Sequence, residues 1–599
     1  MCGIAGAINY KRFDLQKIKE SLFHRGPDEQ SSYNYKNIEL IHTRLSIQDI
    51  SHGHQPFHFG HYTIVFNGEI YNHLELKNEL SEFEFQTTSD TETLLYLYIK
   101  YKEKMFEKLD GMFAFCILNK ETNQLILARD RAGKKPLYLY QDGQTVLFAS
   151  ELNAIKAGIT NLKINETAIE SYLRCGFFFK EFTAYENVIA LESGYLYAID
   201  IESLKIQQQP YFDIKNYYKE TTNLTFEQSL QKVDELLHRS IKDRLESSDL
   251  EVGAFLSGGI DSSLIVAIAS EYKQNLKTFT VKFDGAYDES HLAKLTAQKY
   301  NTTHHELSIS MNLKDDIEKI LFNYGQPFMD SSAIPSYYVS KEAKKYVTVI
   351  LNGDGADELF GGYRRYVPTA NGLIDIASKF SFLTKILPKP HNKKSLYNYG
   401  YRLLSMAKRQ GLEFYLSSTN DIFEDEYQFK ENQINMQMNK YINSVELESL
   451  SKMLYLDFNL ILFSDLLIKM DIATMSQSLE GRSPFLSKYM LEFVPTLKNE
   501  YKIKRGSTKY ILRELSKKYL HRELITQPKR GFEVPLKKWI ENDLKENIFD
   551  SLNNNSYSSQ FIEQRFIGDL LSKRLNISDE KRAKMLWTMY CLEVWKKKQ

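Results

Sequence analysis

The stretch EVGAFLSGGIDSSLIVAIASEY (251–272) joins a short apolar strand to an apolar helix through a loop of glycine and serine. Two more short apolar segments, 277–283 and 346–353, follow it and are separated by helical patterns. Strands that alternate with helices form parallel sheets. We therefore predict a parallel α/β domain that begins with an amphipathic helix at 226–246. Beyond Tyr363 the pattern predicts mostly helices.

The loop at 257–263 combines two glycines with three serines and an aspartate. Glycines let backbone N–H groups close around an anion, hydroxyls add donors, and the start of the following helix contributes its dipole. No Gly-Lys-Ser/Thr follows, so the loop is not a Walker A motif, and it does not fit GxGxxG. A plain turn could also use Gly-Gly, but so many hydroxyls beside an aspartate favour an anion-binding site.

A second polar turn, NGDGADELFGGY (352–363), follows the apolar segment that ends near residue 353. Open α/β sheets bind ligands at this end of their strands. Asp354, Asp357 and Glu358 would repel one another unless a cation or a ligand amine lies between them. An acidic surface turn is the alternative interpretation.

The first 200 residues show a different pattern from the second half of the chain, because short strands with alternating apolar residues outnumber helices there. One helix is expected at 90–104. The expected strands are 62–71, 112–120, 124–130 and 145–151. The polar, Pro-containing stretch that follows predicts a linker. We divide the chain into a sheet-rich domain at 2–205, a linker at 206–225 and a second domain at 226–599.

The amino-acid composition argues against two further classes of function, general nucleic-acid binding and membrane association. The chain has 599 residues, with 77 Lys and Arg against 77 Asp and Glu, and this balance argues against a general nucleic-acid binder. Its four cysteines and the absence of a signal-peptide pattern indicate a cytoplasmic protein. The most apolar stretch, 454–470, contains charged residues, so no membrane association is expected.

Cys2 follows the initiator methionine. Removal of that methionine would leave a free α-amine that can act as a general base for its own thiol. The alternative is a small buried residue at the start of a strand. Four histidines within 52–61 suggest zinc, but their spacings give no single ligand face, so no transition metal is expected.

Five segments in order carry a resemblance: Cys2 itself, 24–28, 42–47, 67–72 and 89–92. Together they resemble the N-terminal-nucleophile glutaminase domain of class II amidotransferases, which implies an αββα fold. Taken singly, each has an ordinary explanation, such as a hairpin turn or a helix N-cap. The resemblance implies Cys2 as nucleophile, Asn67 and Gly68 as the oxyanion hole, Arg44 on the glutamine α-carboxylate, Asp90 on its α-ammonium, and Asn67 and Glu69 as further glutamine contacts.

The second half is similar to the ATP-pyrophosphatase domain of glutamine-hydrolysing asparagine synthetases, which is Rossmann-like. The SGGIDSS loop and the GDGADELFGGY turn carry the resemblance, supported by 326–335, 478–486 and 529–536. In that family the loop holds pyrophosphate, and the strand at 279–283 borders the adenine. The resemblance implies ATP binding by Leu256, Ser257, Gly258, Gly259, Asp261, Ser262, Ser263, Val281, Asn352 and Gly353. It implies Mg²⁺ ligation by Asp261 and Asp357, and an aspartate and adenylate site at Asp354 and Glu358. Lys469 is the nearest candidate for the cation of this site that relatives carry at the position of Ile472.

The resemblance implies an ATP-dependent ligase that uses glutamine, aspartate and ATP, with β-aspartyl-AMP as intermediate and ammonia passing through an apolar channel. It also implies a homodimer. Relatives often carry Lys or Arg where this chain has Ile472, and an aromatic residue where it has Ala132; the region 370–450 matches no assigned element. Two alternatives stay open. The same halves could amidate another carboxylate, such as a uronic acid or a peptide, or the chain could be a nucleotide sensor without catalysis.

Overall fold

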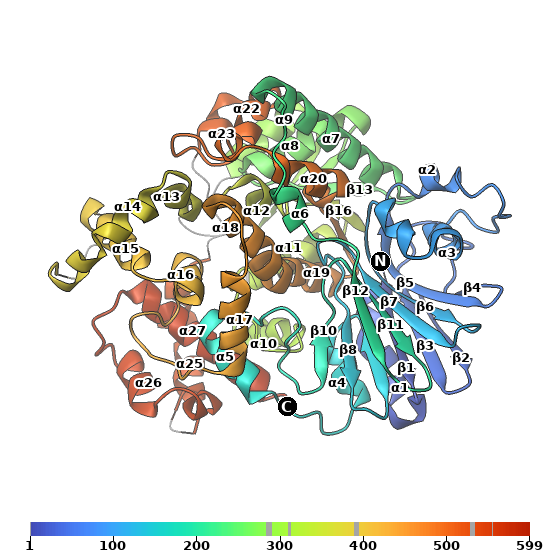
Figure 1. The fold of residues 1–599 in the computed structure, drawn as a ribbon, viewed down its shortest axis with the longest axis horizontal. Coiled ribbons are helices and arrows are strands. Elements are labelled where there is room, and N and C mark those ends of the chain that lie inside the picture. The colour runs from blue at the N-terminus through green and yellow to red at the C-terminus, as the bar shows by residue number, and fades with distance from the viewer. Residues whose placement is uncertain (1, 283–289, 309–312, 389–394, 528–533, 554) are drawn as a thin grey trace.

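The computed structural model describes residues 2–282, 290–308, 313–388, 395–527, 534–553 and 555–599. Its N-terminal half contains two antiparallel six-stranded sheets (Figure 1). The first sheet, in the order β10-β8-β9-β1-β3-β2, consists of β1 (Cys2–Ile8), β2 (Glu29–Tyr35), β3 (Ile38–Arg44), β8 (Tyr138–Gln141), β9 (Val146–Ala149) and β10 (Val188–Ala190). The second, in the order β12-β11-β7-β6-β5-β4, consists of β4 (Phe57–Phe59), β5 (Tyr62–Ile70), β6 (Gly111–Asn119), β7 (Gln124–Arg129), β11 (Tyr195–Asp200) and β12 (Ile206–Pro210).

The two sheets pack face to face around an apolar core that includes Ile4 of β1 and Val65 of β5. Helices cover both outer faces: α1 and α4 contact the first sheet, and α3 contacts the second. The helices of this half are α1 (Leu15–Leu22), α2 (His73–Lys77), α3 (Asp90–Tyr101), α4 (Leu152–Gly158) and α5 (Glu166–Cys175). This αββα layering confirms the predicted architecture.

The second half is organised around a five-stranded parallel sheet in the order β15-β14-β13-β16-β17. Its strands are β13 (Val252–Phe255), β14 (Lys277–Lys282), β15 (Thr303–Ser308), β16 (Val349–Leu351) and β17 (Glu480–Arg482). Helix α8 (Ile260–Tyr272) is apolar over most of its length because it packs between this sheet and the neighbouring helices α7 (Phe226–Glu246) and α22 (Tyr510–Tyr519). The parallel α/β prediction is confirmed.

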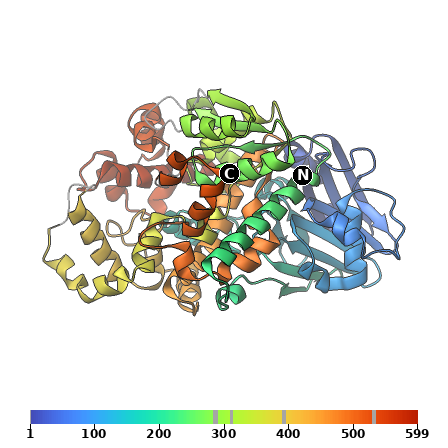
Figure 2. The ribbon, with the colours of Figure 1, turned by 90° about the horizontal axis from the view of Figure 1, so that it is seen from above.

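Helices make up most of the rest, as predicted, and lie beside the sheet-rich half in both views (Figures 1 and 2). Those that connect or cover the parallel sheet are α9 (Ser290–Lys299), α10 (Leu313–Phe322), α11 (Ala333–Ala343) and α12 (Ala356–Phe360). The others include α13 (Val367–Ala370), α14 (Leu373–Lys379), α15 (Leu396–Ala407), α16 (Gly411–Ser418), α17 (Gln433–Asn443), α18 (Ser449–Asp457), α19 (Leu467–Met475), α20 (Lys488–Phe493), α21 (Asn499–Lys502), α23 (Arg522–Thr526), α24 (Leu536–Lys538), α25 (Lys545–Ser551), α26 (Gln564–Leu571) and α27 (Asp579–Lys596). A π-helix over Phe458–Leu466 continues α18 into α19.

The stretch predicted as a linker contains two elements. Strand β12 extends the second sheet by pairing with β11, and α6 (Lys215–Tyr218) follows it. Helix α7 then begins with a capping box between Thr225 and Gln228, at the position that the sequence predicts. Across the described part of the chain, we find no helix whose length and apolar character would let it cross a bilayer.

Candidate active sites

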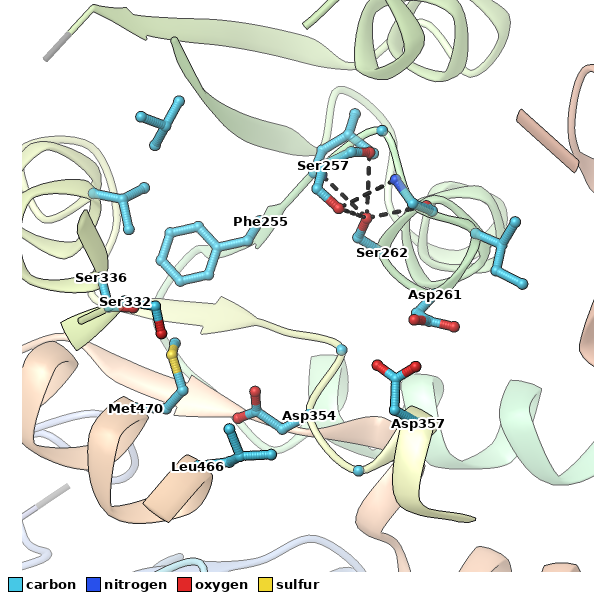
Figure 3. Close-up of a pocket in the computed structure, with 18 of the residues that line it drawn as sticks. Phe255, Ser257, Asp261, Ser262, Ser332, Ser336, Asp354, Asp357, Leu466 and Met470 are labelled. Atoms are coloured by element: carbon cyan, nitrogen blue, oxygen red, sulfur yellow. Dashed lines mark hydrogen bonds between the residues drawn. The ribbon is translucent and has the colours of Figure 1, made fainter. Parts of the chain in front are cut away.

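A cavity of about 590 Å³ opens at the carboxyl ends of β13 and β16 (Figure 3). Ligands of open parallel sheets bind at this edge because the loops that follow adjacent strands meet there. Eight of the ten residues predicted to bind ATP line the cavity: Leu256, Ser257, Gly258, Gly259, Asp261, Ser262, Val281 and Gly353. Phe283 and residues 529–533 lie outside the described residues.

The other two predicted nucleotide contacts lie outside the cavity lining. Ser263 is fully buried in α8 and accepts a hydrogen bond of 3.3 Å from the Thr296 hydroxyl of α9. Asn352 accepts a hydrogen bond of 2.6 Å from the Ser483 hydroxyl. Both side chains therefore stabilise the loops around the cavity and do not face the cavity itself. This role depends on packing, which the sequence pattern does not show.

The Gly-Ser loop is held in shape by its own hydroxyls. Ser257 Oγ and Ser262 Oγ lie 2.8 Å apart, and the Gly259 amide donates to Ser257 Oγ at 3.3 Å. Helix α8 begins at Ile260, so its first amides face the same space as the loop. The arrangement can hold a polyphosphate by backbone N–H groups and hydroxyls.

The two predicted metal ligands are brought together although they lie on different elements. Gly355, at a φ of 87°, turns the chain from β16 into α12, which carries Asp357. Lys509 Nζ lies 2.5 Å from Asp261 Oδ2 and 2.8 Å from Asp357 Oδ1, so the two carboxylates share one cation. Sequence reasoning missed Lys509, because only the fold places this residue, at the start of α22, beside two carboxylates distant in the chain.

The predicted aspartate and adenylate residues line the same cavity. Asp354 Oδ2 pairs with Lys134 Nζ at 2.8 Å, and that lysine comes from the sheet-rich half. Glu358 accepts a hydrogen bond of 2.5 Å from the Tyr363 hydroxyl. Burial, together with the neighbouring Asp357, raises the pKa of Glu358 to about 7.

Lys469 lines the same cavity and pairs with Asp330 at 2.8 Å. Although burial acts to raise the pKa of Asp330, the charge of Lys469 lowers it below its usual range. Ile472, one turn further along α19, is buried and does not line the cavity. Lys469 is therefore a cation that α19 places in the cavity.

A second site lies in the sheet-rich half, at the first residue of β1. Cys2 is buried, and its backbone N–H donates to Asn67 Oδ1 at 3.1 Å. Its carbonyl accepts from Arg25 Nε at 3.2 Å. Burial raises the pKa of the Cys2 thiol, so a base must help to form the thiolate.

The predicted oxyanion residues lie on β5 beside this cysteine. Asn67 is fully buried, and its Nδ2 has no hydrogen-bond partner among the described residues. A buried amide donor without a partner is costly unless a ligand accepts from it. At Gly68 an added Cβ would lie 2.2 Å from the Met112 carbonyl oxygen, so the packing of β5 on β6 requires glycine.

The other three predicted glutamine contacts, besides Asn67, are found on the neighbouring strands and helix. Arg44 lies opposite Cys2 in the β1–β3 register and donates to the carbonyl of Asp49 at 2.6 Å. Asp90 Oδ2 accepts from the Ile70 amide at 2.8 Å, and burial raises the pKa of Asp90 to about 7. Glu69 pairs through Oε2 with Arg482 at 3.0 Å.

The two halves meet through buried charges near both sites. Asp471 on α19 pairs with Arg25 and with Lys135 at 2.8 Å each, and all three side chains are fully buried. Arg25 and Lys135 together lower the pKa of Asp471 against the effect of burial. Contacts from Cys2 through Arg25 to Asp471 thus reach α19, the helix that also carries Lys469 of the ATP-site cavity.

The histidines of 52–61 take part in separate local contacts. His54 Nδ1 lies 2.8 Å from Glu29 Oε2, and His58 Nδ1 lies 2.9 Å from Thr63 Oγ1. Among the described residues no group of three or more His, Cys, Asp or Glu side chains is arranged to hold a metal ion.

Both halves of the chain are similar to known protein families. The asparagine synthase family matches residues 232–597, and the glutamine amidotransferase domain family matches residues 1–212. Asparagine synthetase [glutamine-hydrolyzing] 1 of Bacillus subtilis is 32% identical over 99% of this chain and 96% of its own. Asparagine synthetase [glutamine-hydrolyzing] 3 of the same organism is 28% identical over 89% of this chain and 87% of its own.

Proposed function

The chain belongs to the asparagine synthase family, and from this premise we propose that it makes asparagine from aspartate, ATP and the amide nitrogen of glutamine. The products are asparagine, glutamate, AMP and diphosphate, and one water is consumed. The main observation behind the proposal is that Asp261 of the Gly-Ser loop and Asp357 both pair with Lys509, so the two predicted metal ligands lie close together. An amide-cleaving site at Cys2 in the same chain supplies the nitrogen.

The glutaminase step begins when the Cys2 sulfur attacks the amide carbon of glutamine. The α-amine of processed Cys2, held by Asn67 Oδ1, takes the thiol proton and passes it to the leaving ammonia. The vacant Asn67 Nδ2 donor and the Gly68 backbone N–H stabilise the oxyanion. Water then hydrolyses the thioester to glutamate.

Asp90, Glu69 and Arg44 hold the amino-acid end of glutamine. Arg44 pairs with its α-carboxylate, while Asp90 and Glu69 face its α-ammonium. Their burial strengthens the interactions, because few waters compete with the ligand for these charges.

The synthetase step joins the β-carboxylate of aspartate to the α-phosphorus of ATP and releases diphosphate. Loop amides and the start of α8 bind the diphosphate, and Lys469 stabilises charge near the α-phosphate. Ammonia then attacks the acyl carbon and AMP leaves. Glu358, with its raised pKa, can take the proton that the attacking nitrogen loses.

Asp261 and Asp357 supply the hard oxygen ligands that Mg²⁺ prefers, and Mg²⁺ commonly uses one or two carboxylates with phosphate oxygens. When bound, Mg²⁺ would neutralise charge on the diphosphate group. Lys509 neutralises the two carboxylates in the arrangement described here.

The proposal also covers the cellular location and the oligomeric state of the enzyme. We place the enzyme in the cytoplasm, supported by the free thiols of all four cysteines. We expect a homodimer, as in the family resemblance, and sedimentation velocity tests it.

A substrate panel tests the proposed acceptor. Diphosphate release is measured with aspartate, a uronic acid and a peptide carboxylate, each with ATP and with glutamine or ammonia. We expect release with aspartate and formation of asparagine. If diphosphate were released with another carboxylate and not with aspartate, the proposed acceptor would be wrong. If the chain bound ATP tightly but released no diphosphate with any carboxylate, the proposal that it is an enzyme would be overturned.

Glutamine binding should weaken below neutral pH. The pKa of Asp90 is raised to about 7 by burial, so lowering the pH protonates this carboxylate and removes its attraction for the α-ammonium. We expect the glutamine KM to rise about tenfold between about pH 8 and about pH 6. Asp90→Asn should raise KM at the higher pH and reduce its pH dependence, because Glu69 is then the remaining carboxyl group that titrates at this site. Glu103→Gln, at an exposed position, should preserve the wild-type profile. A wild-type KM that stays constant across this range would contradict the assignment.

A further inference from the structure

A segment of the synthetase half, residues 480–483, reaches the proposed glutamine site through Arg482. Arg482 of this segment is fully buried and reaches Glu69 Oε2 at 3.0 Å across the boundary between the halves. Its other donors are used as well: Nε pairs with Glu480 at 2.6 Å, and Nη1 donates to Ser247 Oγ at 2.8 Å. The guanidinium is therefore fixed from three sides, which gives it a single orientation toward Glu69.

Glu69 uses its two oxygens differently. Oε2 accepts from Arg482, whereas Oε1 is buried and has no hydrogen-bond partner among the described residues. A buried carboxylate oxygen without a donor is costly, and a ligand ammonium would supply the missing donor. This geometry matches the α-ammonium of a bound glutamine.

The charges around Glu69 show why the arginine matters. Burial raises the pKa of Glu69 well above its usual value, and the neighbouring Asp90 and Glu480 act in the same direction, whereas Arg482 lowers it. Two positive charges favour the ionised form, and Arg482 has a larger effect than the N-terminal amine. Without Arg482, the carboxyl group would be protonated over a wider pH range and would attract an ammonium group less.

The same segment also reaches the ATP-site cavity. Arg482 lies beside Leu351 in the parallel β16–β17 register, and its carbonyl accepts from the Asn352 amide at 2.8 Å. The next residue, Ser483, donates to Asn352 Oδ1 at 2.6 Å and lies 3.3 Å from Asp354 Oδ2. Four consecutive residues thus connect the glutamine pocket with the turn that carries the acidic residues.

We propose that Arg482 is a positioning residue of the glutaminase site, contributed by the synthetase half, that orients the Glu69 carboxyl group toward the α-ammonium of glutamine. The inference rests on the proposed function only in naming glutamine as the ligand. It means that the glutamine pocket is complete only when the β16–β17 edge is in place.

The experiment compares Arg482→Met and Arg482→Lys with the wild-type full chain. Glutamate release measures glutaminase activity, and ammonia-dependent asparagine formation measures the synthetase site. For Arg482→Met we expect glutamine KM to rise about tenfold to a hundredfold, with kcat and ammonia-dependent activity within about twofold. Glutamine KM should fall again as the pH is raised, because Glu69 then ionises without its arginine. Arg482→Lys, which keeps the charge, should recover part of the affinity.

Two controls separate positioning from folding. Arg239→Met removes an arginine that is 43% exposed on α7, and it should leave the glutamine KM unchanged. Thermal unfolding of each variant reports its stability. An unchanged glutamine KM in Arg482→Met, or an equal fall of both activities in both Arg482 variants, would overturn the proposal. Failure of the wild type to form asparagine would instead contradict the proposed function, because glutamate release would still report on Arg482.

Discussion

Cys2→Ala should abolish asparagine formation from glutamine while leaving formation from ammonia intact. The alanine variant lacks the sulfur that attacks the amide, and no other cysteine among the described residues lies at this pocket, since Cys116, Cys175 and Cys591 are buried elsewhere. We expect glutamine-dependent activity to fall by at least about a thousandfold. Ammonia-dependent activity should stay within about twofold, because ammonia enters the synthetase step directly.

Cys116→Ala is the matched control. Cys116 is a fully buried cysteine on β6 of the same half and has no assigned catalytic role, so both activities should persist in this variant. Equal loss of both activities in Cys2→Ala would contradict the division into two sites. Mass spectrometry of the wild type should show Cys2 as the first residue, and a retained methionine would rule out the α-amine as the base.

Asp357→Asn should remove the synthetase reaction and spare glutaminase activity. The substitution replaces a charged oxygen ligand with a neutral amide where Asp357 faces Asp261, so the diphosphate would lose part of its counter-charge. We expect diphosphate release to fall about a hundredfold to a thousandfold, in line with the loss of a major electrostatic contact in an active site. Glutamate release from glutamine should persist, because the sulfur nucleophile belongs to the other site.

Asp375→Asn on α14 is the control for a change of charge alone, since Asp375 is exposed and outside the cavity lining. Diphosphate release should be unchanged in that variant. Unchanged diphosphate release in Asp357→Asn would exclude the proposed ligand role. Titration of Mg²⁺ in both variants adds a second measurement, and Asp357→Asn should need more Mg²⁺ for half-maximal rate.

Local sequence patterns predicted much of the fold. Helix α7 occupies the predicted residues 226–246, because its apolar spacing and its Thr225 cap are both local features. Strands β5 and β13 lie within the predicted apolar segments for the same reason. The predicted linker is less simple, because β12 gains its pairing partner β11 from outside the linker stretch.

The sites could be predicted only as far as their residues occur in local motifs. Cys2, Asn67 and the Gly-Ser loop stand in recognisable motifs, whereas Lys509 and Arg482 act on residues 248 and 413 positions away. Nothing in one sequence shows that such distant residues meet. Ser263 belongs to the loop motif, yet the turn of α8 directs it toward α9 instead of the cavity.

The ion pairs that Arg25 and Lys135 make with Asp471 have a consequence for the newly synthesised chain, because Asp471 is translated long after its two partners. Arg25 and Asp471 are 446 positions apart, so at roughly 5–20 residues per second the ribosome adds the aspartate about 20–90 s after the arginine. During this interval Lys135 lacks Asp471, whereas Arg25 keeps its pairing with Glu151 of the same half at 2.7 Å. The boundary face of the newly synthesised half should therefore carry one more uncompensated positive charge, at Lys135, until α19 is translated and Asp471 packs against it.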